Sequence, residues 1–264
     1  MWHDLHQLLR STPGAWSVCV WDAGGRQCYG YHEHVVRSAA SLIKVPLAAA
    51  VLDVAAQAHA FFDLNTTLAL NEADRVEGTG GLDTAPAGTT KTVRVLISHA
   101  LRESDNTASN LLIKLIGRER VNEWLGARGL HTRLRRKFID FEALAAGHDN
   151  TMTASDMCAI FGQVLQEARY APLIEDLRHA VGDGKLEAGV PPGVPIAHKV
   201  GDLPGVEHDA GIVFAPNGAY IVAVLGVDLP DVEAARRTIA DVSQIVWETW
   251  NVHLRATDQS PLQP

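Results

Sequence analysis

Two short runs rich in valine and aromatic residues open the chain and predict a β-hairpin. They cover residues 15–21 and 27–32, and the glycine-rich segment 22–25 between them predicts the turn. Residues 2–10 are compatible with a short helix before the hairpin. The chain therefore begins with the first two strands of a predicted antiparallel sheet.

The next segment, residues 42–58, is almost entirely apolar and consists of good helix formers. A helix that is apolar on every side is a buried helix. Pro46 is tolerated only in the first turn of a helix, so we expect this helix to begin close to Ser41.

The middle of the chain is predominantly helical, and its end is built of strands and turns. Residues 61–98 are rich in glycine and predict loops, and residues 131–152 show no clean period and predict a long functional loop. Helical patterns cover residues 93–101, 106–116, 121–128, 153–168 and 172–181. Strand patterns follow at residues 196–200, 209–214 and 220–227, before a closing helix over residues 231–250.

This order of elements predicts one α+β domain over residues 1–264, made of two lobes. An α/β lobe, with an antiparallel sheet flanked by helices, takes residues of about 1–60 and 190–264 from both chain ends. An all-α lobe of about residues 61–189 is inserted between them. A chain of 264 residues can bury a sizeable core in such a fold.

The charge balance and hydropathy argue against two kinds of partner. The chain carries 23 basic and 31 acidic residues, a net charge of −8, without a basic cluster, so we expect no nucleic-acid binding. No apolar stretch is long enough to span a membrane. The chain starts with Met and lacks a signal-peptide pattern, so we expect a cytoplasmic protein, or a periplasmic or secreted one if this is a trimmed mature form.

The cysteines and histidines show no pattern of cross-linking or metal binding. Three cysteines cannot all pair within one chain, and Cys19 and Cys28 lie diagonally on the predicted hairpin, so we expect three reduced thiols. The 12 histidines have no metal-ligand spacing, and no glycine-rich phosphate loop is present. We therefore expect neither a metal nor an organic cofactor.

Ser41 and Lys44 form the first candidate catalytic pair. Two residues three apart on a helix lie on the same face. The free backbone N–H groups at a helix start stabilise negative charge on a serine oxygen. Burial lowers a lysine pKa, so Lys44 would accept the serine proton. The alternative is an N-capping serine and a lysine that reaches solvent.

Two further polar groups flank predicted helices and strands. Ser104 and Asn106 stand in Ser-Asp-Asn between two helices, where the hydroxyl would relay a proton and the amide would hold a substrate; the alternative is a helix N-cap. Lys199 and Gly201 open a strand, where the cation would attract a substrate carboxylate and the glycine would admit a ligand. The backbone N–H of Asp202 would complete an oxyanion hole with that of Ser41, although a lysine on a strand is most often a solvated side chain.

The three motifs together resemble those of class A β-lactamases and penicillin-binding proteins, in which S-x-x-K, S-D-N and K-T-G recur in this order. The resemblance extends over most of residues 12–250. It includes the segments Ser104-Asp105-Asn106-Thr107-Ala108-Ser109-Asn110-Leu111-Leu112, Thr132-Arg133-Leu134 and Asp209-Ala210-Gly211-Ile212. The two-lobe fold of that family agrees with the lobes predicted above.

The chain departs from this family at two places. Val200 stands where the family has a hydroxyl that holds the substrate carboxylate, and His208 is a candidate to compensate in part. The family also carries a deacylating Glu in a loop, with an Asn four residues later. Here Asp140 and Glu142 are the candidates, without that Asn, and the alternative for both acids is a salt bridge to the basic run 135–137.

The resemblance implies a serine hydrolase that forms an acyl-enzyme on Ser41 and opens β-lactam amides, with slow deacylation or deacylation that depends on Asp140 or Glu142. One alternative is a D-Ala-D-Ala carboxypeptidase or esterase on the same scaffold. A second is a non-catalytic sensor of β-lactams or muropeptides. The partner in each case is a small molecule, and the oligomeric state stays open.

Overall fold

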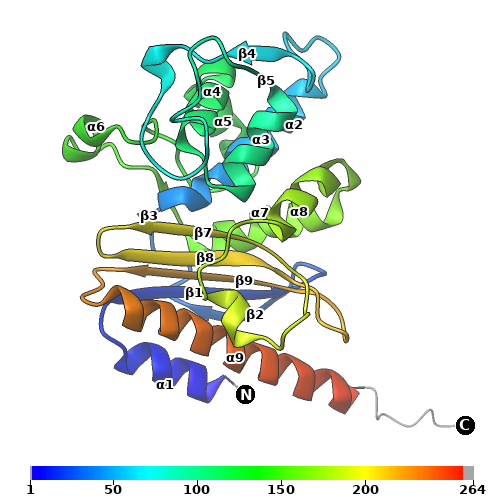
Figure 1. The fold of residues 1–264 in the computed structure, drawn as a ribbon. Coiled ribbons are helices and arrows are strands. Elements are labelled where there is room, and N and C mark those ends of the chain that lie inside the picture. The colour runs from blue at the N-terminus through cyan, green and yellow to red at the C-terminus, as the bar shows by residue number, and fades with distance from the viewer. Residues whose placement is uncertain (1, 258–264) are drawn as a thin grey trace, which may run out of the picture.

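The core of the molecule is a five-stranded antiparallel sheet, which the computed structural model shows together with the rest of residues 2–257 (Figure 1). The strand order is β2-β1-β9-β8-β7. The strands are β1 (Ala15–Asp22), β2 (Gln27–Tyr31), β7 (Ile196–Leu203), β8 (Val206–Val213) and β9 (Tyr220–Val227). The two ends of the chain therefore supply one sheet, because β1 pairs with β9 along its whole length.

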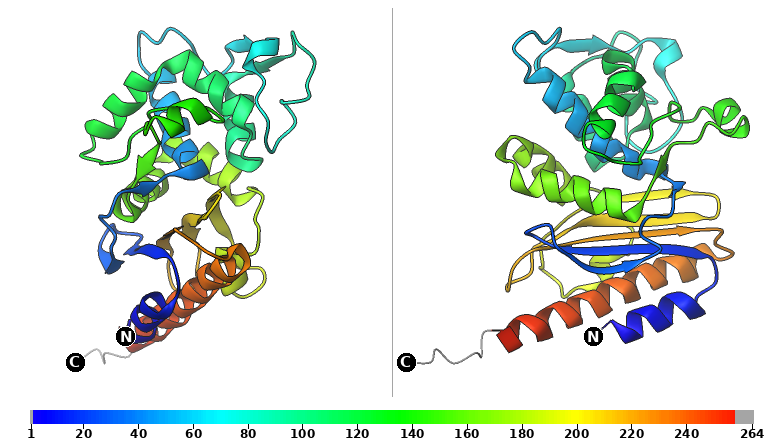
Figure 2. Two further views of the ribbon diagram at one scale, coloured as in Figure 1. Left: turned by 90° about the vertical axis from the view of Figure 1, so that its left-hand side faces the viewer. Right: turned by 180° about the vertical axis from the view of Figure 1, so that it is seen from behind.

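Helices cover both faces of this sheet. The helices α1 (His3–Ser11) and α9 (Val232–Thr257) lie side by side on one face, and α7 (Ala154–Gln166) packs on the other (Figures 1 and 2). Side chains alternate along β9, so Val222 contributes to the core under α9, whereas Ala223 contributes to the core under α7. This period of two explains why a strand buried on both sides is apolar throughout.

A helical layer stands beyond α7, away from α1 and α9 (Figure 1). At its centre is α2 (Lys44–Ala55), with ten buried residues, as expected for a helix that is apolar all round. The other helices are α3 (Val93–Arg102), α4 (Asn106–Ile116), α5 (Arg118–Gly126) and α6 (Phe141–Ala145), whereas α8 (Ala171–Arg178) packs against β7 beside α7. Short strands and 3-10 turns complete the chain: β3 (Arg37–Ser38) with β6 (Thr151–Met152), β4 (Thr67–Ala69) with β5 (Thr90–Thr92), η1 (Ala40–Ile43), η2 (Glu72–Asp74), η3 (Ala168–Tyr170) and η4 (Leu186–Gly189).

The predicted α+β fold, with an antiparallel sheet flanked by helices, is confirmed. The boundaries of the two lobes stay a prediction, but α7, which lies within residues 61–189, packs directly on β1, β8 and β9. The three cysteines are free thiols, as expected. Within residues 2–257, no helix has the length and hydropathy needed to cross a membrane.

Candidate active site

Ser41 and Lys44 meet at the start of α2. Ser41 lies in the 3-10 turn η1, and Lys44 is the first residue of α2, so Pro46 falls in the first turn of the helix as the sequence requires. The Lys44 Nζ lies 3.1 Å from the Ser41 Oγ. The local geometry therefore places an amine directly beneath a hydroxyl that lines a cleft.

The hydrogen-bond partners of Lys44 can be satisfied by a neutral amine. Its Nζ lies 2.5 Å from the carbonyl oxygen of Ser104 and 2.8 Å from the Oδ1 of Asn106, and both of these oxygens can only accept. Two N–H groups satisfy these acceptors, and the lone pair of a neutral amine is then free to accept the Ser41 hydroxyl. Burial lowers the pKa of Lys44 well below its usual range, and the nearby charge of Lys199 lowers it further.

Ser104 has a strained backbone that aims two of its atoms at Lys44. Its φ of 58° lies in the left-handed region, which is uncommon for a residue with a side chain. Its Oγ lies 3.0 Å from Lys44 Nζ, in addition to the carbonyl contact. The next residue, Asp105, caps α4 by accepting the backbone N–H of Ala108 at 2.7 Å. The N-cap alternative thus applies to Asp105, and Ser104 stays free for the cleft.

Strand β7 closes the opposite side of the site. A Cβ added to Gly201 would come within 3.1 Å of the Ser41 backbone nitrogen, so only glycine allows the strand to approach the nucleophile this closely. Asp202 follows it and lines the cleft. Lys199 is buried with its Nζ 2.9 Å from the Val200 carbonyl oxygen, and burial lowers its pKa to about 8. Lys199 therefore lies just behind the cleft and is not a solvated side chain.

Phe138 lies beside Lys44, in the loop in which the sequence predicted a deacylating acid at Asp140 or Glu142. The centre of its ring lies 4.5 Å from Lys44 Nζ. Asn110 of α4 holds its backbone in place by accepting the Phe138 N–H at 2.8 Å and donating to the Phe138 carbonyl at 3.1 Å. No sequence motif marked Phe138. Its partner Asn110 follows Asn106 by one helical turn and so lies on the same helix face, which is the signal that could have indicated it.

The interpretation of Asp140 and Glu142 as deacylating residues does not fit the structure. The Asp140 carboxylate accepts the Ala143 N–H at 3.0 Å and caps the short helix α6, and Glu142 is exposed on that helix. Neither residue lines the cleft. Their expected salt bridges to residues 135–137 are also absent from the described chain, where Arg136 pairs with Asp149 instead, at 2.8 Å.

His208 is likewise not a substrate-binding residue in this structure. Its Nε2 lies 2.9 Å from the carbonyl oxygen of Ser38, and its Nδ1 accepts the Gly226 N–H at 3.2 Å. Both imidazole nitrogens are thus engaged by backbone groups, and burial lowers the pKa of His208 to about 4. A neutral buried histidine cannot replace the missing hydroxyl at Val200.

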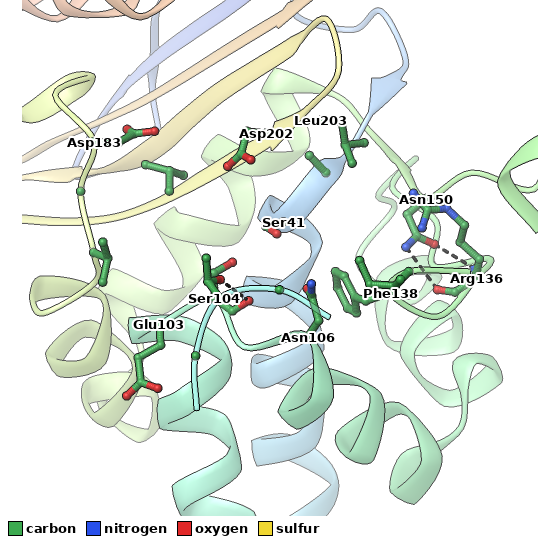
Figure 3. A pocket seen from close by; sticks show the side chains of 18 of the residues that line it. Ser41, Glu103, Ser104, Asn106, Arg136, Phe138, Asn150, Asp183, Asp202 and Leu203 are labelled. Atoms are coloured by element: carbon green, nitrogen blue, oxygen red, sulfur yellow. Dashed lines mark hydrogen bonds between the residues drawn. The ribbon is translucent and has the colours of Figure 1, made fainter. Parts of the chain in front are cut away.

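The cleft between these elements has a volume of about 530 Å³ (Figure 3). Ser41 and Ser104 line it near each other, since both contact Lys44, with Phe138 at one side and Asp202 on the β7 side. Three acidic side chains line it, which are Glu103, Asp183 and Asp202. The sequence motifs indicated neither Glu103 nor Asp183, because both come into the cleft from segments that lack a recognisable pattern.

One group of potential metal ligands gathers beside the cleft in the described part of the chain, formed by His99, Glu103 and Asp105. These atoms already have protein partners. His99 Nδ1 lies 2.9 Å from Glu103 Oε2, and Asp105 accepts the backbone N–H groups of Ala108 and Leu82. The donor set therefore serves to hold the turn around Ser104.

The fold and the geometry of the cleft are those of a β-lactamase-like hydrolase, and comparison with known proteins agrees. The model of the beta-lactamase enzyme family matches residues 1–250. The β-lactamase VEB-1 of Pseudomonas aeruginosa is 24% identical over 241 residues, which cover 81% of this chain and 77% of that protein. The chain therefore belongs to the beta-lactamase enzyme family.

Solved structures of this family superpose on most of the chain. A β-lactamase from Sphaerobacter thermophilus DSM 20745 is 25% identical, with a TM-score of 0.85 over 96% of this chain and 98% of that one. An ancestral class A β-lactamase (GNCA) is 28% identical, with a TM-score of 0.84 over 93% of this chain and 98% of that one. The predicted resemblance to class A β-lactamases is confirmed.

Proposed function

We propose that this protein is a serine hydrolase that opens β-lactam amides through an acyl-enzyme on Ser41. The observation that carries the proposal is the buried Lys44 amine, which lies 3.1 Å from the Ser41 hydroxyl and 3.0 Å from the Ser104 hydroxyl. One amine in contact with two hydroxyls links the nucleophile to a proton donor for the leaving group.

Acylation would proceed in two proton transfers. Neutral Lys44 takes the Ser41 proton while the Ser41 oxygen attacks the substrate carbonyl carbon. The backbone N–H groups of Ser41 and Asp202 stabilise the resulting oxyanion. The C–N bond then breaks, the leaving nitrogen takes the Ser104 proton, and Lys44 returns its proton to Ser104. The product is an ester between Ser41 and the opened amide.

Deacylation lacks a carboxylate at the place where this family usually carries it. A water molecule must be deprotonated as it attacks the ester, and a carboxylate near the amine is the usual base in this family. In the described structure Phe138 fills that place, with its ring 4.5 Å from Lys44 Nζ and its backbone fixed by Asn110. An aromatic ring cannot take a proton, so the acyl-enzyme is expected to be long-lived.

Intact-protein mass spectrometry after mixing with penicillin G tests the proposal. We expect a stable adduct on wild type and none on Ser41→Ala, with the modified peptide containing Ser41. Asp140→Asn and Glu142→Gln should leave the adduct lifetime unchanged, because neither side chain lines the cleft. The absence of any adduct with penicillin G or nitrocefin would refute the acylation step.

A D-Ala-D-Ala carboxypeptidase or esterase is the second candidate, and Phe138 favours it, because a site without a deacylating carboxylate traps β-lactams. Turnover of a D-Ala-D-Ala peptide or a p-nitrophenyl ester, faster than that of nitrocefin, would support it. A non-catalytic sensor would retain β-lactam affinity in Ser41→Ala, whereas both enzymes would lose all turnover.

A further inference from the structure

The charged side chains that line the cleft are mostly acidic. Glu103, Asp183 and Asp202 contribute carboxylates, and Arg136 is the single cation among the lining residues. The Arg136 guanidinium is already paired with Asp149 at 2.8 Å and is almost entirely buried. The lining of the cleft therefore presents negative charge to a bound molecule. Lys44 and Lys199 are buried and do not line it.

Among the three acidic residues of the cleft, Asp202 is linked most directly to Ser41. It follows Gly201, which packs against the backbone of Ser41, and Figure 3 shows it on the β7 side of the cleft. Its side chain is exposed and makes no hydrogen bond or ion pair within residues 2–257. Its negative charge also acts on both Lys44 and Lys199 by favouring their protonated forms. A free carboxylate thus lines the cleft directly after the residue that packs against Ser41.

Asp183 lies on the same side of the cleft as Asp202 (Figure 3). Its Oδ2 pairs with Lys185 at 3.0 Å, but its Oδ1 is buried and has no hydrogen-bond partner in the described chain. Because this oxygen is buried, Asp183 acts on a molecule in the cleft through its charge and not through a hydrogen bond to Oδ1.

The cations near β7 are not available to a substrate carboxylate. Lys185 is fully buried and also pairs with Glu207 at 2.5 Å. Arg236 approaches Glu207 at 3.5 Å and Asp183 at 3.6 Å. Lys199 is buried and does not line the cleft, and the Val200 side chain, which lines it, offers no hydroxyl. A carboxylate placed here would meet the apolar Val200 and the carboxylates of Asp183 and Asp202.

We propose that the β7 side of the cleft selects substrates that carry a neutral or cationic group, such as an amine, next to the bond that is cleaved, and disfavours those with a carboxylate there. This inference rests on the proposed function, because it concerns the substrate class of the Ser41 site. It separates this protein from enzymes specialised for penicillin-like carboxylates.

A matched series of three β-lactams tests the proposal. The series is penicillin G as the free carboxylate, its methyl ester and its 2-(diethylamino)ethyl ester, which is cationic at pH 7. The second-order rate of adduct formation is measured for each by intact-protein mass spectrometry, in which the adduct mass identifies the form that reacted. We expect the cationic ester to acylate Ser41 at least about tenfold faster than the carboxylate at low salt, and high salt to reduce this ratio.

Charge-neutralising variants assign the preference to the cleft. Asp202→Asn and Asp183→Asn should each reduce the cation-to-carboxylate rate ratio by about threefold or more. Glu142→Gln removes the same charge from an exposed site outside the cleft and should leave the ratio unchanged. The melting temperatures of all variants check that they are folded.

The outcomes distinguish the two proposals. Faster acylation by the carboxylate than by both esters would overturn the charge preference while supporting the acyl-enzyme. A preference for the cation that persists in both Asp variants would also overturn it, because the preference would then not come from these residues. No adduct with any of the three forms would overturn the proposed function, and this inference with it.

Discussion

The chemistry of Lys44 depends on its being neutral, which burial among apolar residues makes possible. Because burial lowers the pKa of Lys44, the amine loses its proton at a lower pH than an exposed lysine does, and acylation should increase as it does so. We predict that the acylation rate constant falls with decreasing pH once the amine becomes protonated, with a limiting slope of about tenfold per pH unit, and that this fall begins at a lower pH than for an exposed lysine. Stopped-flow measurement with nitrocefin gives this profile.

Lys44→Met is the matched control for this pH dependence, because it keeps the length of the side chain and removes the amine. It should lower the rate by about 100-fold or more and flatten the profile. The pKa of Lys199 is lowered to about 8, so Lys199 stays protonated on the acid side of the profile. The same rate and the same pH profile in wild type and Lys44→Met would contradict the assignment of Lys44 as the base.

Phe138 offers a second test at the level of single residues. Phe138→Glu places a carboxylate near the amine, and we predict that it shortens the lifetime of the acyl-enzyme by at least about tenfold, since general bases contribute about 10²–10⁴-fold. The lifetime is measured from the decay of the adduct mass after excess β-lactam is removed. Phe138→Leu is the control for loss of the ring, and equal lifetimes in both variants would count against the role of Phe138.

Sequence reasoning found those site residues whose geometry is local. The spacing of Ser41 and Lys44 along one helix and the position of Ser104 before the next are set by chain geometry, so the motifs could be placed correctly. Phe138 and Asp183 enter the cleft because of how distant segments pack, which no short-range pattern encodes. The same reason explains why counting along a loop of unknown shape gave Asp140, although Phe138, two residues earlier, is the residue beside Lys44.

At the scale of elements, long periodic segments were predicted well and short pairings were not. The helices α3 and α4 agree with their predicted ranges within one residue, because their apolar faces repeat over several turns. The two-stranded pairs β3–β6 and β4–β5, each only two or three residues long, were not predicted. Such short strands exist only through contacts with distant partners, so their sequences carry little signal.

The loop between Arg136 and Asn150 is held closed mainly by one amide side chain. The Asn150 Oδ1 accepts the backbone N–H groups of Arg135 and Arg136 at 2.8 and 3.0 Å, and its Nδ2 donates to the Arg136 carbonyl at 3.2 Å. We predict that Asn150→Ala destabilises the protein by about 3 kcal/mol, or roughly 5–10 °C in Tm, because these groups lose their partners in a buried place. Calorimetry measures the change.

Asn217→Ala, at an exposed loop position, is the control for Asn150→Ala and should change Tm by about 1–2 °C at most. The loop also fixes Phe138, so Asn150→Ala should in addition speed the decay of the acyl-enzyme. A variant with wild-type Tm and wild-type adduct lifetime would show that the loop does not depend on this amide.

At the scale of the whole molecule, a buried ionic cluster ties the last strands to the segment before them. His198 of β7 lies 2.9 Å from Asp209 of β8 and 3.1 Å from Glu187 of η4. Burial alone would lower the pKa of His198, but Asp209 and Glu187 outweigh it and raise the pKa to about 10. The folded protein thus retains a proton on this histidine that the unfolded chain releases near pH 6.5.

The stability that this proton provides is present in full below pH 6.5 and is lost as the pH rises towards about 10, because the folded state binds more protons in that range. Lys199 acts in the opposite sense above about pH 8, since its folded-state pKa is lowered. The test is therefore the difference in unfolding free energy between wild type and His198→Gln, measured by urea titration at each pH. We predict that this difference decreases by a few kcal/mol between pH 6.5 and 10, because each unit of pKa shift corresponds to about 1.4 kcal/mol. A constant difference would mean that the histidine is neutral in the folded protein and that the cluster holds the strands together by hydrogen bonds alone.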